Sequence, residues 1–81
     1  MIYQTKKLGA NKKVIWYDNG VQVLISYTTP VAAYLPQGDG SGYVRTETYY
    51  SKTTSRHINA WLENVETEKV NQSVLDKLIE A

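Results

Sequence analysis

The hydrophobic pattern of this chain changes its period once, near residue 50, and this change constrains the fold more than any other feature. Upstream, apolar and polar residues alternate along short segments, as in strands that place one face in a core. Downstream, an apolar stripe typical of an amphipathic helix falls at i, i+3, i+4 and i+7: Ile58, Trp61, Leu62 and Val65. The pattern predicts an α+β fold, a small antiparallel β-meander of about five strands followed by one amphipathic helix and a short C-terminal helix.

Five segments have the spacing of strands: residues 2–8, 14–17, 21–27, 31–35 and 43–50. Asp18-Asn19-Gly20, between the second and third, is the preferred chemistry of a tight hairpin. With Asn19-Gly20 as a two-residue turn, Trp16 faces Val23 and Val14 faces Ile25, and this side is predicted to face the core. The opposite side is half polar, which predicts either a partly covered face or a contact surface. The glycine-rich run 36–42 is predicted to be a flexible hairpin tip.

The two helices have recognisable starting signals. Several hydroxyl residues precede the apolar stripe, and Thr54 is the predicted N-cap. A second helix is predicted to begin at Asn71, with Val70 and Leu75 as a hydrophobic staple. Packing of the hairpin on the first helix predicts one core centred on Trp16 and Trp61.

Length and composition exclude several classes of protein. The 81 residues predict a single domain, 1–81, with a thin core. With no cysteine and one histidine, the usual zinc sets are excluded, and no metal or cofactor is expected. The sequence contains no signal-peptide pattern and no apolar run long enough to span a membrane. We therefore expect a cytoplasmic protein.

The choice of aromatic residues points to recognition. The chain has seven Tyr, two Trp and no Phe, and exclusive use of tyrosine suggests rings whose hydroxyls meet water. Tyr17, Tyr43 and Tyr49 share strand faces with polar residues, so we predict that they are exposed and bind a partner, together with Arg45. Cross-strand aromatic pairing is the alternative explanation.

Charge is divided between the two halves of the chain. Residues 1–57 carry seven cations against three anions, a net +4, whereas residues 58–81 carry two against five, a net −3. If nucleic acid is the partner, the contacts are predicted to come from the cations Lys6, Lys7, Lys12, Lys13 and Arg45. The sequence contains no helix-turn-helix, RNP motif or basic helix.

No catalytic constellation emerges, so the protein is predicted not to be an enzyme. The loop Gly38–Gly42 lacks the Lys-Ser/Thr and the following helix of a phosphate-binding loop. Hydroxyl residues, Arg56 and His57 cluster at residues 51–59, where the strand period gives way to the helical one. This junction is interpreted mainly as a helix start, with His57 against Trp61. A partner-binding role for Thr54, Arg56 and His57 remains the alternative.

Two tracts, Ser26-Tyr27-Thr28-Thr29-Pro30-Val31-Ala32-Ala33 and Tyr50-Ser51-Lys52-Thr53-Thr54-Ser55-Arg56-His57-Ile58-Asn59-Ala60-Trp61-Leu62, are similar to a known group of proteins. They resemble the DUF8033 group of short phage and prophage proteins of unassigned function. The resemblance implies a mobile-element origin and transfers no catalytic residue. It also suggests that Ser51, Thr53, Thr54, His57 and Asn59 matter together.

These observations lead to two functional hypotheses. The first is a phage- or mobile-element-encoded accessory protein that binds a host macromolecule, most simply a protein, and inhibits a defence system such as CRISPR. The alternative is a small nucleic-acid-binding or regulatory protein. A homodimer, formed through the half-apolar sheet face or the C-terminal helix, is compatible with both.

Overall fold

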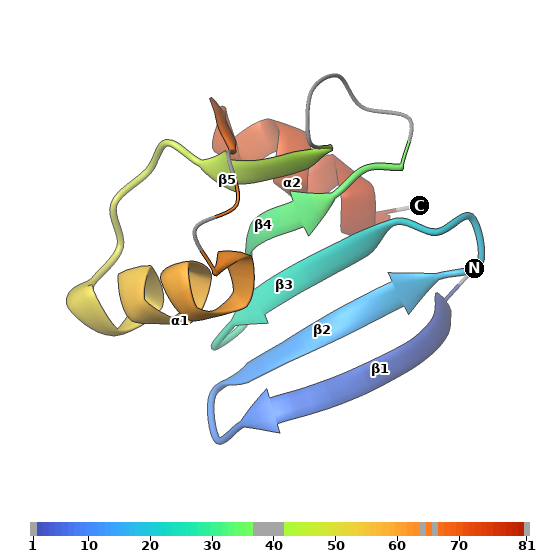
Figure 1. Cartoon of the computed structure of the whole chain (residues 1–81), viewed down its shortest axis with the longest axis horizontal. Helices are drawn as coiled ribbons and strands as arrows, with labels where there is room; N and C mark the ends of the chain where they lie inside the picture. The colour runs from blue at the N-terminus through green and yellow to red at the C-terminus, as the bar shows by residue number, and fades with distance from the viewer. Residues whose placement is uncertain (1, 37–41, 64, 66, 81) are drawn as a thin grey trace.

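The computed structural model describes residues 2–36, 42–63, 65 and 67–80, which form six strands and two helices (Figure 1). In chain order these are β1 (Ile2–Gly9), β2 (Lys12–Tyr17), β3 (Gln22–Ser26), β4 (Thr29–Tyr34), β5 (Tyr43–Thr46), α1 (Lys52–Leu62), β6 (Glu68–Val70) and α2 (Gln72–Glu80). The predicted α+β class, with an antiparallel meander and two helices, is confirmed.

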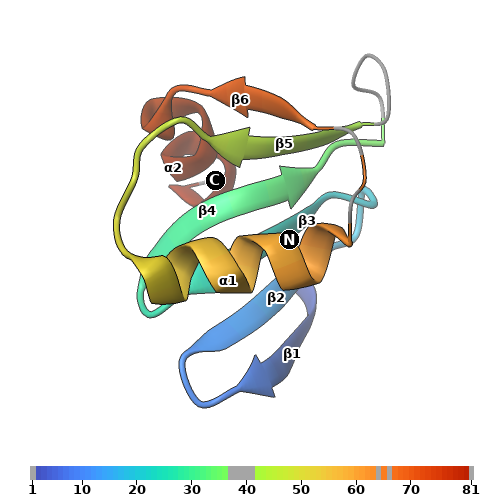
Figure 2. The ribbon, with the colours of Figure 1, turned by 60° about the vertical axis from the view of Figure 1, so that its left-hand side comes forward.

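All six strands belong to one sheet, in the order β1-β2-β3-β4-β5-β6. The first five pair antiparallel with their neighbours in sequence, and β6 pairs parallel to β5 (Figure 2). Parallel neighbours require a crossover connection, and α1 supplies it. The sequence analysis missed β6, because three residues are too few to establish a hydrophobic period.

The helices cover opposite faces of the sheet, so the protein has two apolar clusters rather than one core. The α1 cluster consists of Val14, Leu24, Val31, Ala32, Ile58 and Leu62. The α2 cluster consists of Val23, Ile25, Ala33, Val44 and Leu75. The predicted single core centred on Trp16 and Trp61 is therefore wrong. Trp16 is 39% exposed, and Trp61 packs half-buried against the edge of the α1 cluster.

The hairpin between β2 and β3 forms, but with a different register from the predicted one. Val14 lies opposite Leu24 and Ile15 opposite Val23. The loop has three residues, closed by bonds from the Tyr17 N–H to the Val21 carbonyl (2.9 Å) and from the Gly20 N–H to the Tyr17 carbonyl (3.0 Å). Gly20 takes a left-handed φ of 90°, as the last residue of such a loop requires.

This one-residue difference explains the burial of β3. Adjacent residues point to opposite faces of a sheet, so Val23 enters the α2 cluster and Leu24 the α1 cluster. Both faces of β3 and β4 are consequently covered, and Val23, Leu24, Ala32 and Ala33 are all fully buried. The face predicted to be partly covered or a contact surface is therefore divided between the two sides of the sheet: Ile15 and Tyr17 pack against the α2 cluster, whereas Leu24 belongs to the α1 cluster.

Local capping determines where the helices begin. The N-cap of α1 is Ser51, whose hydroxyl accepts from the Thr54 N–H (3.1 Å), so the predicted cap at Thr54 is wrong. Asn71 caps α2 by accepting from the Ser73 N–H (2.9 Å), which agrees with the predicted start. Within the described part of the chain, neither helix is long and apolar enough to cross a membrane.

The segments around β5 also differ from prediction. β5 ends at Thr46, so Tyr49 and Tyr50 lie in irregular chain before α1. Most of the predicted glycine-rich tip, residues 37–41, lies outside the described residues. Gly42 does belong to them, with a φ of 82°, and a Cβ placed there would lie 2.8 Å from the Leu35 carbonyl oxygen. Only glycine fits this position.

Candidate functional site

The β1–β2 hairpin projects beyond the part of the sheet that the helices cover (Figure 1). The residues of β1 whose side chains the structure describes are exposed from Ile2 to Leu8, whichever face they occupy. The hairpin carries four lysines, Lys6, Lys7, Lys12 and Lys13, and no acidic residue precedes Asp18 in the chain. It is thus a cationic two-stranded ribbon.

The register places two of these lysines directly opposite each other. Lys7 pairs with Lys13, while Lys6 pairs with Val14 and shares its face of the sheet. Like charges directly across an antiparallel pair repel each other, so this lysine pair does not help to stabilise the fold. An anion bound between the two strands would relieve this repulsion.

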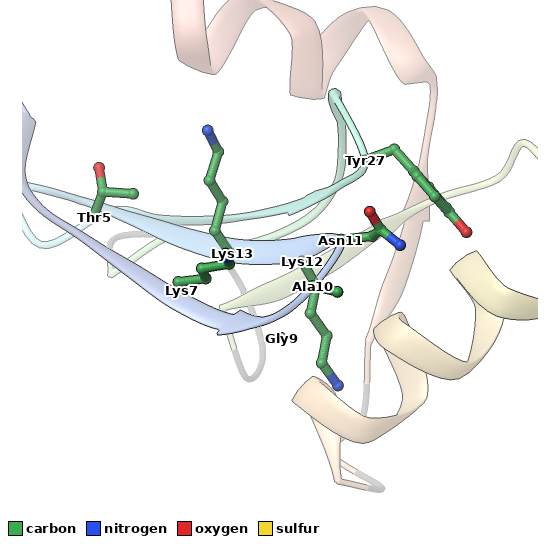
Figure 3. Close-up of a pocket in the computed structure, with 8 residues that line it drawn as sticks. All are labelled: Thr5, Lys7, Gly9, Ala10, Asn11, Lys12, Lys13 and Tyr27. Carbon is green, nitrogen blue, oxygen red and sulfur yellow. The ribbon is translucent and has the colours of Figure 1, made fainter.

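The tip of the hairpin is hollowed into a groove of about 420 Å³ (Figure 3). Its lining consists of Thr5, Lys7, Gly9, Ala10, Asn11, Lys12, Lys13 and Tyr27. Figure 3 shows Lys12 and Lys13 leaving the hairpin on opposite sides, so that cationic groups lie on both sides of the tip. The groove therefore combines ammonium groups, an amide and one aromatic ring.

Tyr27 joins this groove to the rest of the molecule. It lies in the turn between β3 and β4, and its N–H donates to the Asn11 carbonyl (2.7 Å). Its φ of 58° is left-handed, which is uncommon for so bulky a residue. The ring is 51% exposed, and its centroid lies 6.1 Å from that of His57. A strained backbone that presents an exposed aromatic ring is a feature found at binding sites.

A polar bridge beneath Tyr27 fixes the start of α1 to the end of β3. The Ser26 hydroxyl lies 3.0 Å from the Thr54 hydroxyl and 2.8 Å from His57 Nδ1. Ser26 and Thr54 are 2% and 4% exposed. Buried hydroxyls need partners, and here each satisfies the other. The two tracts that carry the family resemblance therefore meet at this bridge.

The surroundings of the imidazole at this bridge favour its neutral form. Burial, and then the positive charge of Lys12, lower the pKa of His57 below its ordinary value of 6.5. The prediction that His57 lies against Trp61 is wrong, since its partners are Ser26 and Tyr27. The effect of the Lys12 charge on His57 shows that the junction 51–59 lies near the basic hairpin.

A serine bonded to a histidine also resembles the nucleophile and base of a hydrolase. The charged group that perturbs His57 is a lysine, however, whereas such a mechanism uses a carboxylate to orient the histidine. Ser26 is almost inaccessible and shares its hydroxyl with Thr54. This geometry favours a structural bridge.

The other predicted partner-binding residues do not form one surface. Tyr17 is half-buried against the α2 cluster, and Tyr43 is half-buried against the α1 cluster, beside Tyr34 and Trp61. Their predicted exposure is wrong, because cross-strand and helix packing covers both rings. Tyr49, by contrast, is 70% exposed. Thr54 is buried in the bridge, whereas Arg56 is exposed on α1.

Arg45 lies apart from the four lysines. It belongs to β5, on the far side of the central strands, and its Nη1 donates to Asn59 Oδ1 (3.2 Å). It lines a smaller hollow of about 240 Å³ with Asn59, Leu62, Val65 and Thr67. The predicted set of five nucleic-acid contacts therefore separates into four residues on the hairpin and one elsewhere.

Ser26, Tyr27 and Asn11 were not predicted as site residues. Asn11 and Tyr27 lie in turns, which the sequence marks only as breaks between strands. A signal was present at Ser26, which is the single polar residue in the otherwise apolar run 23–26 of β3. A polar residue at a buried position requires a partner, and the partner lies 31 residues away.

Among the described residues, no group of His, Cys, Asp and Glu is arranged to hold a metal ion. Comparisons with curated proteins and with solved structures found no match. A family model described as a family of unknown function (DUF8033) matches residues 1–77. The match extends well beyond the two tracts noted in the sequence, across the basic hairpin and into α2. The chain therefore belongs to the DUF8033 family.

Proposed function

We propose that this protein binds nucleic acid through its β1–β2 hairpin. The observation that carries the proposal is the concentration of Lys6, Lys7, Lys12 and Lys13 on a two-stranded ribbon whose strands contain no acidic residue. A chain with a net charge of only +1 places these cations together at one end of its sheet. Clustered lysines of this kind supply the sequence-independent attraction to phosphates.

Two features distinguish the hairpin from an ordinary solvated face. Lys7 and Lys13 lie opposite each other, and their mutual repulsion would be relieved by an anion near both ammonium groups. The groove also contains Tyr27 and Asn11, and this combination of ammonium, aromatic and amide groups suits a polynucleotide better than a simple anion. The polar bridge at Ser26 is proposed to hold Tyr27 in place rather than to catalyse a reaction.

The number of cations predicts the strength of the salt dependence. If all four lysines contact phosphates, log K should fall against log salt with a slope of ~−3.6 on duplex DNA and ~−2.8 on a single strand. Fluorescence anisotropy with labelled oligonucleotides from 25 to 200 mM salt measures this slope.

Charge reversal tests which surface is responsible. Lys7→Glu and Lys13→Glu should each weaken binding at 50 mM salt and reduce the slope, because each replaces a cation of the hairpin with an anion. Lys69→Glu is the matched control, since Lys69 is an exposed lysine of β6, at the opposite edge of the sheet. Equal losses in all three variants, or no binding by the unaltered protein at 50 mM salt, would refute the proposal.

A second proposal is a phage-encoded accessory protein that inhibits a host defence system by binding a host protein. The observation that favours it is the pair of exposed rings before α1, Tyr49 (70%) and Tyr50 (44%), which lie outside the basic hairpin. A pull-down from a bacterial host after nuclease treatment tests it. A partner that survives nuclease and is lost in Tyr49→Ser supports this function, and loss of all partners opposes it.

A further inference from the structure

Resting on the proposed nucleic-acid function, we infer that the bound strand is single and that its bases stack on Trp16 and Tyr27. These two rings lie at opposite ends of the same row of cations on the hairpin. The inference concerns the class of nucleic acid, which the lysines alone do not define, because lysines contact phosphates in duplexes and in single strands alike.

Trp16 is an exposed indole on the α1 side of β2. Val14 enters the α1 cluster, and because side chains alternate along a strand, Lys12 and Trp16 share its face. Lys6 pairs with Val14 and Gln4 with Trp16, so this face of the ribbon carries two lysines, a glutamine and an indole. The indole is 39% exposed, although α1 covers the neighbouring strand.

Tyr27 marks the other end of this row. Its N–H binds the Asn11 carbonyl, next to Lys12, and its ring contacts His57 of α1. Asn11 and Trp16 are five positions apart in extended chain, a distance of ~17 Å. Because Val14 is buried under α1, a strand on this face would pass Tyr27 and Lys12, run along β1 past Lys6, and then reach Trp16. This alternation of rings and cations matches surfaces that bind unpaired bases by stacking and their phosphates by charge.

The same contacts oppose the main duplex alternative. A two-stranded ribbon recognises duplex DNA by entering the major groove. Here the turn of the hairpin is bonded to the β3–β4 turn through Tyr27 N–H and Asn11 O, at 2.7 Å, so its tip does not project freely. The rings would also have no unpaired base to stack on, since bases in a duplex are stacked on one another.

The test compares a labelled oligo-dT, an oligo-rU of equal length and a mixed-sequence DNA duplex by anisotropy at 50 mM salt. We expect tighter binding of the single strands than of the duplex. Trp16→Leu and Tyr27→Leu should each weaken single-strand binding by about 5- to 150-fold, the range for losing one base stack. Trp16→Phe, which keeps a ring, should retain most of the affinity, a rescue that separates stacking from folding.

The matched control is Tyr49→Leu, which removes an even more exposed ring away from the hairpin and should leave affinity unchanged. Thermal melting of each variant checks that it is folded. Tighter binding of the duplex, or unchanged affinity in both Trp16→Leu and Tyr27→Leu, would overturn this inference but leave the proposed function intact. Absence of binding to all three probes would overturn both. Preference for dT or for rU decides between DNA and RNA.

Discussion

Replacing Ser26 with alanine is the sharpest test of the bridge between β3 and α1. The Ser26 hydroxyl is the common partner of Thr54 Oγ1 and His57 Nδ1. Removing it leaves the Thr54 hydroxyl without this hydrogen-bond partner. Because Thr54 is only 4% exposed, water cannot replace the lost bond. The half-buried His57 ring can recover a bond from solvent. The destabilisation should therefore come mainly from Thr54.

The expected effect follows from these two environments. An unsatisfied buried hydroxyl costs ~1–3 kcal/mol, and the solvated imidazole adds little. A domain of this length has a total stability of about 4–12 kcal/mol at ~0.05–0.15 kcal/mol per residue. Ser26→Ala should thus remove a substantial fraction of the stability and lower the Tm by roughly 4–24 °C, at ~4–8 °C per kcal/mol.

Urea denaturation of four proteins measures the coupling: unaltered, Ser26→Ala, Thr54→Val and the double variant. Ser26→Ala leaves the Thr54 hydroxyl without a partner, and Thr54→Val removes that hydroxyl. The loss of unfolding free energy in the double variant should therefore be smaller than the sum of the two single losses, by ~0.5–3 kcal/mol. Thr53→Ala, at an exposed neighbouring position, should be nearly neutral. Additive free energies in the cycle, or a Ser26→Ala protein of unchanged stability, would refute the bridge.

Three further predictions concern the helices and His57. Ser51→Ala should cost ~1 kcal/mol in urea denaturation by removing the α1 cap, whereas Ser51→Asp should be nearly neutral; equal effects would place the cap elsewhere. Leu75→Ala should cost ~2–5 kcal/mol, since Leu75 is fully buried in the α2 cluster, and a loss below 1 kcal/mol would mean that α2 is not docked. The pKa of His57 is lower in the folded chain than in the unfolded one, so the unfolded state binds more protons between the two values. Its contribution to stability should be complete above about pH 6.5 and lost as the pH falls through the folded-state value, and His57→Gln should flatten this part of the stability–pH curve.

The sequence by itself determined the features that depend on neighbouring residues. Alternating residues in 2–46 and the apolar stripe around Ile58 and Leu62 specify strands followed by a helix, because each pattern buries one side of one element. Asp18-Asn19-Gly20 specifies a turn, and Asn71 a helix start, through hydrogen bonds made within a few residues. The four hairpin lysines were likewise identified, since their clustering is visible in the chain.

Tertiary structure decided which side of each element is buried and which residues meet. A loop of three residues rather than two reverses the faces of β2 relative to β3, and local chemistry permits both. Coverage by α1 and α2 on opposite faces leaves Tyr17 and Tyr43 half-buried and Trp16 exposed. The Ser26–His57 bond joins residues 31 apart, a contact that depends on how α1 crosses the sheet. No local rule contains this information, because it resides in the packing of elements distant along the chain.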